Sequence, residues 1–371
     1  MISRRLIIAA AVTTVLAAGG AVGAREFLFN PQNTNPQEPG ARSETSNPDD
    51  TDPSIPAHTG LDKSSDPGLR VLSKHEKTME RGFDRMMLFR DIPDSVVQAE
   101  RAAPAMAATL LEYKRFGIEP LVIFEPQGLD VNNIDPAIFT AYFKALVAHG
   151  VPPDAIGTWS LFPEPNLPLW STDSDLGNTD RVAFGRNLEN SAQALKQSFP
   201  QAKVMLLLDS ATYASHDVDY AHKRPPETML EYTNIQPGLV DEFCIQGFPW
   251  TNEARAKDFV SADLALAAAK KLGGPQKVKV SFNTGTFSQV AAPISGATAT
   301  AAQREQNLNG ILEQAKIVQQ NGFAVAVNIF GADKMPDEAN WSYVGGPSTE
   351  KLKAFIQAAA RAGIRLSIFD E

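Results

Sequence analysis

Cysteine is almost absent from this chain, with Cys244 the only one among 371 residues. A chain with one cysteine cannot form an internal disulfide framework, so a small disulfide-rich scaffold is excluded. Cys244 lies in the run Val240–Ile245, and no histidine is near it in the sequence. A buried thiol that packs like a small apolar side chain is therefore expected, and a cysteine nucleophile is the alternative.

Basic charge is also scarce. The chain has 34 Lys and Arg against 43 Asp and Glu, a formal net charge of −9 at pH 7. It therefore lacks the positive field that binds a phosphate backbone, and no nucleic-acid partner is expected. Phosphate-binding motifs are missing as well: no G-x-G-x-x-G follows the first predicted strand, and no P-loop occurs.

Candidate metal ligands are few. Of the five histidines, only His216 and His222 stand close together, on either side of a polar segment. Solvated loop residues are the preferred interpretation, because a metal site needs several convergent ligands at defined spacing. We expect no metal and no cofactor. A metal-dependent hydrolase or a lyase on the same fold is the alternative.

A long apolar run occurs only near the N-terminus, where Arg4 and Arg5 precede the uncharged stretch 6–24. Basic residues followed by an apolar segment and small residues are typical of a secretory signal peptide. The stretch is also long enough to cross a bilayer, so residues 1–24 are predicted to be a signal peptide or a signal anchor. Both predict an extracellular or cell-envelope protein whose membrane contact is confined to this segment.

Residues 25–67 contain many prolines among Asn, Ser, Thr, Asp and Glu, and almost no large apolar side chains. Such a segment cannot bury enough apolar surface to fold, so we expect a disordered, proline-rich tether. The folded domain is then expected at 68–371, as one unit and as a monomer, because the composition does not change along it.

Short apolar runs alternate with helical-period segments throughout this domain. The predicted strands are Met86–Phe89, Leu121–Phe124, Ile156–Phe162, Val204–Leu208, Val240–Ile245, Val278–Phe282, Ala324–Phe330 and Ile364–Phe369. The predicted helices between them are Ala103–Phe116, Pro136–Ala148, Arg181–Gln197, Ser261–Leu272, Gln303–Asn321 and Thr349–Ala362. This alternation predicts a (β/α)8 barrel, with a doubly wound parallel sheet as the alternative.

Acidic residues follow several predicted strands, at the end of the barrel where active sites lie. Glu125, Glu164, Asp91 and Asp209 all fall at this position. Carboxyl groups crowded on one rim raise one another's pKa, which suits a general acid for a glycosidic oxygen. Asp91 and Asp209 have the alternative role of capping the next helix. Glu164 lies between two prolines and does not fit that pattern.

Aromatic residues gather at or after the same strand ends. They are Trp159, Phe162, Trp170, Phe248, Trp250 and Trp341. A flat aromatic face can stack on the C–H face of a pyranose, and the alternative is that these rings fill the core.

Several segments, in this order, resemble motifs of glycoside hydrolase family 26. Residues 120–126 (PLVIFEP) resemble a strand that ends in Glu-Pro, and residues 159–170 (WSLFPEPNLPLW) resemble the strand that carries the acid/base. Residues 232–241 (YTNIQPGLVD) resemble a Pro-Gly segment, and Ile329-Phe330 with Trp341 resembles the last motif. The resemblance implies a mannanase-like barrel that hydrolyses oligo- or polysaccharides.

The resemblance also implies roles for individual residues. Glu164 takes the position of the acid/base, and the predicted substrate-binding residues are Asn166, Trp170, Gln246, Phe248, Trp250 and Trp341. Asn283 takes the position of the family's nucleophile, and Phe248 that of the tyrosine that holds it. An amide cannot form a glycosyl ester, so retention in the family's manner is not expected.

Three hypotheses follow from this departure. Glu125 or Asp209 acts as the base of an inverting hydrolase, or Asn283 orients a substrate N-acetyl group that attacks the anomeric carbon. The third is a carbohydrate-binding barrel without activity. The predicted strands that carry these motifs also come one position earlier along the chain than in the family. This displacement predicts that the C-terminal strand takes the place of the family's first strand. The alternative is that Leu69–Leu72 forms a short first strand.

Overall fold

The structure, a computed structural model, describes residues 55–126, 129–166, 180–209, 226–247, 261–284, 301–330 and 349–369. Within these residues, eight parallel strands form a closed barrel in which each strand pairs with the next along the chain. They are β1 (Arg85–Asp91), β2 (Glu119–Glu125), β3 (Thr158–Ser160), β4 (Lys203–Asp209), β5 (Glu242–Gly247), β6 (Lys279–Thr284), β7 (Val325–Phe330) and β8 (Arg365–Phe369).

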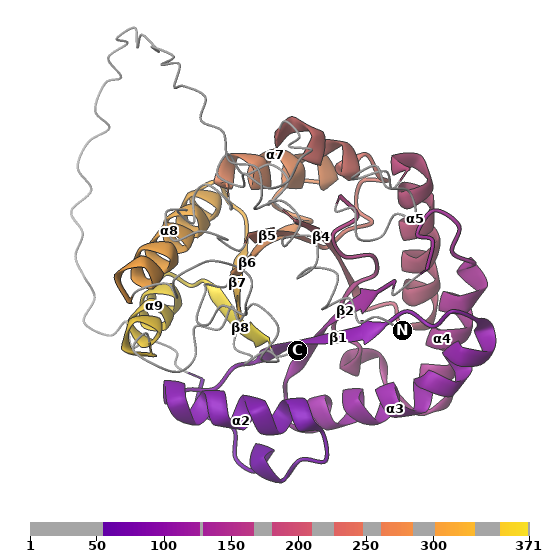
Figure 1. Cartoon of the computed structure of the whole chain (residues 1–371), viewed down its shortest axis with the longest axis horizontal. Helices are drawn as coiled ribbons and strands as arrows, with labels where there is room; N and C mark the ends of the chain where they lie inside the picture. The colour runs from indigo at the N-terminus through magenta and orange to yellow at the C-terminus, as the bar shows by residue number, and fades with distance from the viewer. Residues whose placement is uncertain are drawn as a thin grey trace, which may run out of the picture.

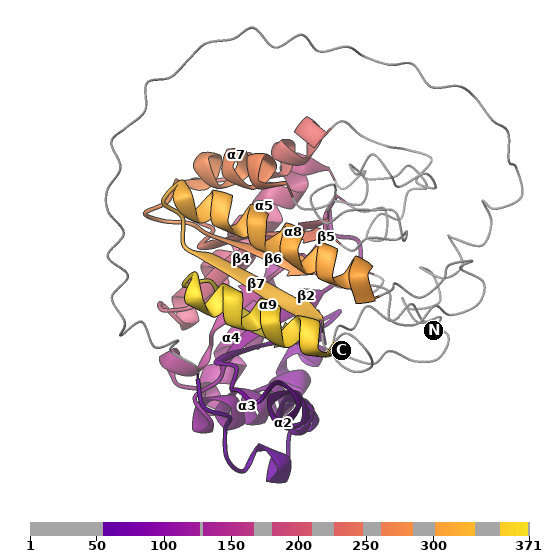
Figure 2. The same ribbon diagram turned by 90° about the vertical axis from the view of Figure 1, so that its left-hand side faces the viewer.

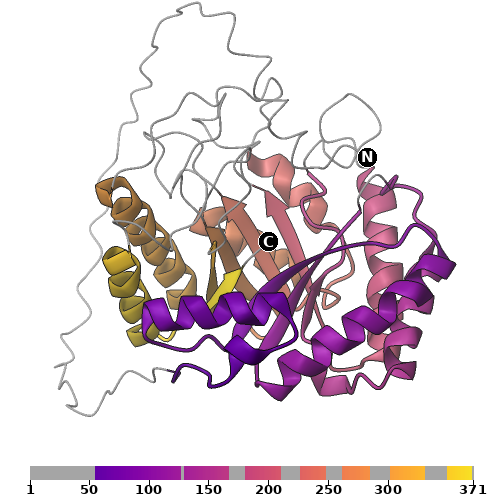
Figure 3. The ribbon, with the colours of Figure 1, turned by 60° about the horizontal axis from the view of Figure 1, so that its bottom comes forward.

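Helices surround this barrel (Figure 1). They are α2 (Pro67–Met79), α3 (Val96–Arg115), α4 (Pro136–Ala148), α5 (Arg181–Ser198), α7 (Ala262–Leu272), α8 (Ala301–Gln320) and α9 (Thr349–Arg361), with 3-10 turns η1 (Leu61–Lys63), η2 (Pro153–Ala155) and η4 (Pro226–Thr233). Helices α8 and α9 lie side by side along the outside of the strands (Figure 2). Figure 3 shows the strands enclosed by the ring, with the indigo helix α2 in front.

The predicted (β/α)8 barrel is confirmed, and its last strand completes it. β8 pairs with β7 along five register positions and with β1 through Met86↔Ile368 and Met87↔Phe369. Leu69–Leu72 lies within helix α2, so the alternative of a short first strand there is wrong. Its Asp-Pro start explains the helix: Asp66 accepts a hydrogen bond from the Leu69 N–H, and Pro67 occupies the first turn.

Residues 55–66, called the N-terminal arm below, pack against the barrel domain. Leu61 is fully buried in the core. The backbone N–H and Nδ1 of His58 both lie 2.7 Å from the buried carboxylate of Glu76. The Gly82 N–H donates to the Ile55 carbonyl at 2.6 Å. Packed structure therefore begins before the predicted boundary at residue 68, and residues 1–54 lie outside the described part.

The barrel interior differs from the core between strands and helices. Alternate strand residues point inward. On β1, β2 and β4 the middle of the interior is apolar, since Met87, Leu121 and Met205 are buried there outside the outer hydrophobic core. On the β5–β8 side the inward residues other than Ala326 are polar or cysteine: Glu242, Cys244, Gln246, Lys279, Ser281, Asn283, Asn328, Arg365 and Ser367.

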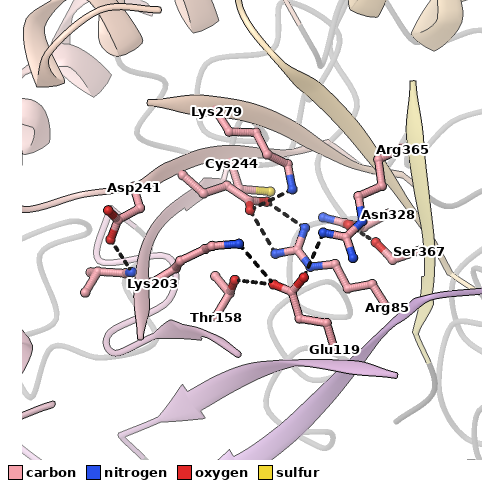
Figure 4. A network of polar contacts seen from close by, with 12 residues as sticks. Arg85, Glu119, Thr158, Lys203, Asp241, Cys244, Lys279, Asn328, Arg365 and Ser367 are labelled. Atoms are coloured by element: carbon pink, nitrogen blue, oxygen red, sulfur yellow. Dashed lines mark hydrogen bonds and ion pairs between the residues drawn. The ribbon is translucent and has the colours of Figure 1, made fainter. Parts of the chain in front are cut away.

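Charged side chains close the barrel at the amino ends of the strands (Figure 4). Arg85 donates from Nη1 and Nη2 to the two carboxylate oxygens of Glu242 at 3.0 and 2.8 Å. Lys279 lies 3.1 Å from Glu242, and Arg365 lies 2.7 Å from Glu119. Burial would raise the pKa of Glu242, but Arg85 and Lys279 outweigh it and lower that pKa well below its usual range. We call these five residues the barrel floor.

Candidate active site

Acidic residues gather at the carboxyl ends of the strands, opposite the barrel floor. Asp91 and Glu125 end β1 and β2 and are register partners. Asp209 ends β4 and is the register partner of Gln246 on β5. Because parallel strands of a barrel end at one rim, the structure brings these residues to the same face, as the sequence predicts. The capping alternative for Asp91 is wrong, since Ser95 caps the next helix by accepting from the Gln98 N–H.

Glu164 follows β3 in a constrained backbone conformation. Its φ angle is 52°, and Glu80 is the other described non-glycine residue with positive φ. Pro163 and Pro165 flank it, and its N–H donates to the Leu207 carbonyl of β4 at 2.9 Å. A side chain in the left-handed region costs about 1–3 kcal/mol and persists where surrounding contacts impose it; such residues cluster at functional sites.

The carboxylate of Glu164 is buried and meets an amide. The side chain is 5% exposed. Nε2 of Gln246 donates to its Oε1. Glu164 thus lies against β4 through its backbone and against β5 through its side chain. The structure brings two predicted site residues into direct contact here.

Asn166 ties the segment after β3 to the end of β4. Its Nδ2 donates to the Asp209 carbonyl at 2.6 Å, and its Oδ1 accepts from the Asp209 N–H at 3.1 Å. Asn166 is 1% exposed. This side chain pairs with the backbone as a neighbouring strand would, so it fixes the segment that carries Glu164.

Asn283 is fully enclosed by protein partners. Its Oδ1 accepts from Asn328 Nδ2 at 2.6 Å and from the Cys244 thiol at 3.1 Å, and its Nδ2 donates to Gln246 Oε1 at 3.2 Å. It has no exposed surface. Both lone pairs of the amide oxygen are therefore used within the protein.

Cys244 is a buried, free thiol, as its sequence context predicts. Burial raises the pKa of Cys244 to about 12. A thiol with this pKa stays protonated at neutral pH, so it acts as a hydrogen-bond donor and does not supply a nucleophilic thiolate.

The aromatic residues divide into two sets. Trp159 has no exposed surface and packs edge-on against Phe124 and Phe143. Phe162 packs against Phe139 and Phe184. These two rings fill the core, which the sequence left as the alternative. The predicted substrate-binding residues Trp170, Phe248, Trp250 and Trp341 lie outside the described residues.

Metal-site clusters and membrane-spanning helices are both absent from the described residues. They contain no cluster of three or more His, Cys, Asp or Glu side chains with the geometry of a metal site. His216 and His222 lie outside the described ranges. Within the described part of the chain, no helix combines the length and the apolar character that crossing a bilayer requires.

Asn328 and Ser367 are parts of this site that the sequence analysis missed. Both are buried on the strands that follow β6, and Asn328 contacts Asn283. A signal existed in the sequence: every second residue of β5 and β6 is polar or a cysteine, which is unusual for a buried parallel strand.

Comparison with solved structures places this architecture among known folds. The GH5_18 protein from Streptomyces cattleya, solved in complex with GlcNAc, has a TM-score of 0.53 at 14% identity, with 79% of this chain and 74% of that one covered. The endo-1,4-beta-mannanase from Rhizomucor miehei has a TM-score of 0.50 at 11% identity, with 84% and 95% covered. The chain shares their barrel fold. No family model and no curated protein sequence matches it.

Proposed function

We propose that this protein is an exported glycoside hydrolase that cleaves oligo- or polysaccharides, with Glu164 as the general acid. The observation that carries the proposal is Glu164 itself. It is a buried carboxyl group at the carboxyl end of a barrel strand, held with positive φ between two prolines. A barrel needs no such residue for its stability, whereas a proton donor must be held in a fixed place.

The same rim supplies candidates for the second carboxyl group. Asp209 has its backbone fixed by Asn166 and lies on the strand next to Glu164. Glu125 is a buried carboxyl group at the end of β2. In an inverting enzyme one of them activates a water on the opposite face of the sugar, at a carboxyl separation of roughly 6.5–9.5 Å. We favour Asp209, because its position is fixed relative to Glu164.

The fold supports this class of substrate but does not define the sugar. The two solved neighbours are a mannanase and a protein with bound GlcNAc. The first substrates to test are therefore β-1,4-mannan and oligomers of N-acetylglucosamine. For any glycan that is cleaved, the anomeric proton of the first product, followed by NMR, distinguishes inversion from retention.

Replacement of Glu164 tests the proposed acid. General acid catalysis contributes about 10²- to 10⁴-fold in rate, and an activated aryl leaving group departs without protonation. Glu164→Gln should therefore abolish hydrolysis of natural glycans and leave measurable turnover of a nitrophenyl glycoside. An equal loss for the two kinds of substrate would show that Glu164 is not the acid.

A carbohydrate-binding barrel without activity is the second candidate. It is favoured by Asn283, which occupies the position of the nucleophile in the family that the sequence resembles and is hydrogen-bonded on all sides. Calorimetric titration with glycan oligomers tests this candidate. Binding without hydrolysis, unchanged in Glu164→Gln, would favour a binding protein over an enzyme.

A further inference from the structure

Four polar side chains form one continuous row around the β5–β8 side of the barrel mouth. Gln246, Asn283, Asn328 and Ser367 are successive register partners on these strands. Ser367 donates to Asn328 Oδ1, Asn328 donates to Asn283 Oδ1, and Asn283 donates to Gln246 Oε1. Gln246 then donates to Oε1 of Glu164. We call these four residues the amide row; every donor in it points toward Glu164.

The direction of the amide row is fixed at its centre. The Cys244 thiol donates to Asn283 Oδ1 from one inward position below on β5. If the Asn283 amide alone turned over, its NH2 group would face the NH2 group of Asn328, which can only donate, and the Cys244 sulfur, which is a weak acceptor. Asn283 and Asn328 have no exposed surface, so water cannot supply replacement partners. In this arrangement Gln246 directs its carbonyl to Asn283 and its NH2 to Glu164.

We propose that Gln246 and Asn283 are positioning residues that direct the acidic proton of Glu164 to Oε2. The inference rests on the proposed role of Glu164 as the acid. Because Oε1 accepts from Gln246, the proton is carried by Oε2. It passes from Oε2 to the glycosidic oxygen as the bond from that oxygen to the anomeric carbon breaks. The carboxylate that remains keeps the Gln246 hydrogen bond, which strengthens when the acceptor becomes charged.

Other carboxyl groups lie at the same rim as Glu164. They are Asp209 on β4, Glu125 on β2 and Asp91 on β1.

The test follows the protonation of Glu164 directly and needs no substrate. Infrared spectra of the full chain are recorded across pH, and the spectrum of the same protein carrying Glu164→Gln is subtracted. In Asn283→Asp the new carboxylate has no N–H donor, so Gln246 must turn its NH2 toward that carboxylate and its carbonyl toward Glu164. We expect the titration midpoint of Glu164 to rise by about one pH unit or more. Gln246→Met, which removes the donor, should raise it by less.

A double-mutant cycle separates this mechanism from the charge that Asn283→Asp adds. If the introduced aspartate acts through Gln246, its effect shrinks when Gln246 is already methionine, and the two shifts are not additive. Ser160→Ala is the matched control, because this buried hydroxyl on β3 has no hydrogen-bond partner within the described residues. It should leave the midpoint unchanged.

Additive shifts, or an unchanged midpoint in Gln246→Met, would overturn the proposal. Gln246 is only partly buried, so its variant remains informative if Asn283→Asp does not fold. If the protein hydrolyses no glycan but shows the expected titration shifts, the inference about the amide row stands and the proposed function is wrong. If hydrolysis depends on Glu164 but these shifts are absent, the proposed function stands and the inference is wrong.

Discussion

At the scale of single residues, the backbone of Glu164 is the most informative feature. Natural sequences place glycine, or at times asparagine, where φ is positive. This chain instead keeps a side chain there, next to a proline that restricts the backbone further. The conformational cost is retained together with a buried carboxyl group, which is the combination expected where a side chain is kept for its chemistry.

A glycine at this position should stabilise the protein. Glu164→Gly removes the strain of a positive φ and should raise the free energy of unfolding by about 1 kcal/mol, while glycan hydrolysis is lost. Urea denaturation measures the change. Glu80→Gly is the matched control, since Glu80 has a φ of 58° at the C-terminal end of α2 and its carboxylate pairs with Lys353 rather than with a residue of the site. If Glu164→Gly lowers the free energy of unfolding while Glu80→Gly raises it, the positive φ of Glu164 is not a source of strain.

The sequence locates Glu164 but does not reveal its surroundings. Two prolines beside a glutamate at a strand end mark the position without a structure. Asn328 is harder to assign, because the polar alternation of β5 and β6 does not continue along β7, where Asn328 is the one polar residue. Ser367 follows Arg365 at an alternate position of the short strand β8. The roles predicted for Trp170 and Trp250 stay predictions.

At the scale of elements, the helix Pro136–Ala148 has the bounds that the sequence predicts, because Asp135-Pro136 pairs a capping side chain with a proline in the first turn. Helix α2 begins with the same Asp-Pro pair but was not predicted, and α3 begins at Val96 rather than at the predicted Ala103. Strand β3 was the least predictable. Only Thr158–Ser160 of the run Ile156–Phe162 is a strand, since the residues after Ser160 turn toward β4 to place Glu164.

The barrel floor should be intolerant of the loss of one partner. Arg85→Met leaves the carboxylate of Glu242 buried with only part of its compensation, and we expect a destabilisation of about 3–5 kcal/mol. Adding Glu242→Leu should restore much of this loss, because no buried carboxylate remains. Chemical denaturation of the two variants checks the order. A double variant less stable than Arg85→Met would show that Glu242 stabilises the protein in a way other than by neutralising the charge of Arg85.

The N-terminal arm is the second element with a testable contribution. A chain that begins at Asp66 lacks Leu61, whose burial contributes about 1.5–3 kcal/mol, and leaves Glu76 without His58. Its melting temperature should fall by several degrees. A chain that begins at Asp52 keeps every contact of the arm and should melt like the full protein. Equal melting of the two chains would show that the arm adds no stability.

At the scale of the whole molecule, the barrel floor determines the response to acid. Burial would raise the pKa of Glu119, but Arg365, Arg85 and Lys203 outweigh it and hold that pKa at about 2. A lowered folded-state pKa gives stability that is complete above the unfolded-state pKa of about 4.5 and is lost as the pH falls toward 2. Glu119→Gln should therefore lower stability at pH 7 and flatten its decline between pH 4.5 and 2, as followed by thermal melts.

The closure of the barrel by β8 has a kinetic consequence. β1 and β7 each lack one neighbour until Arg365–Phe369 has been synthesised, so the ring cannot close on a growing chain. Contacts between the two ends of a sequence form slowly, because the intervening loop must first be ordered. In the export that we propose, the barrel therefore stays open until β8 has been synthesised.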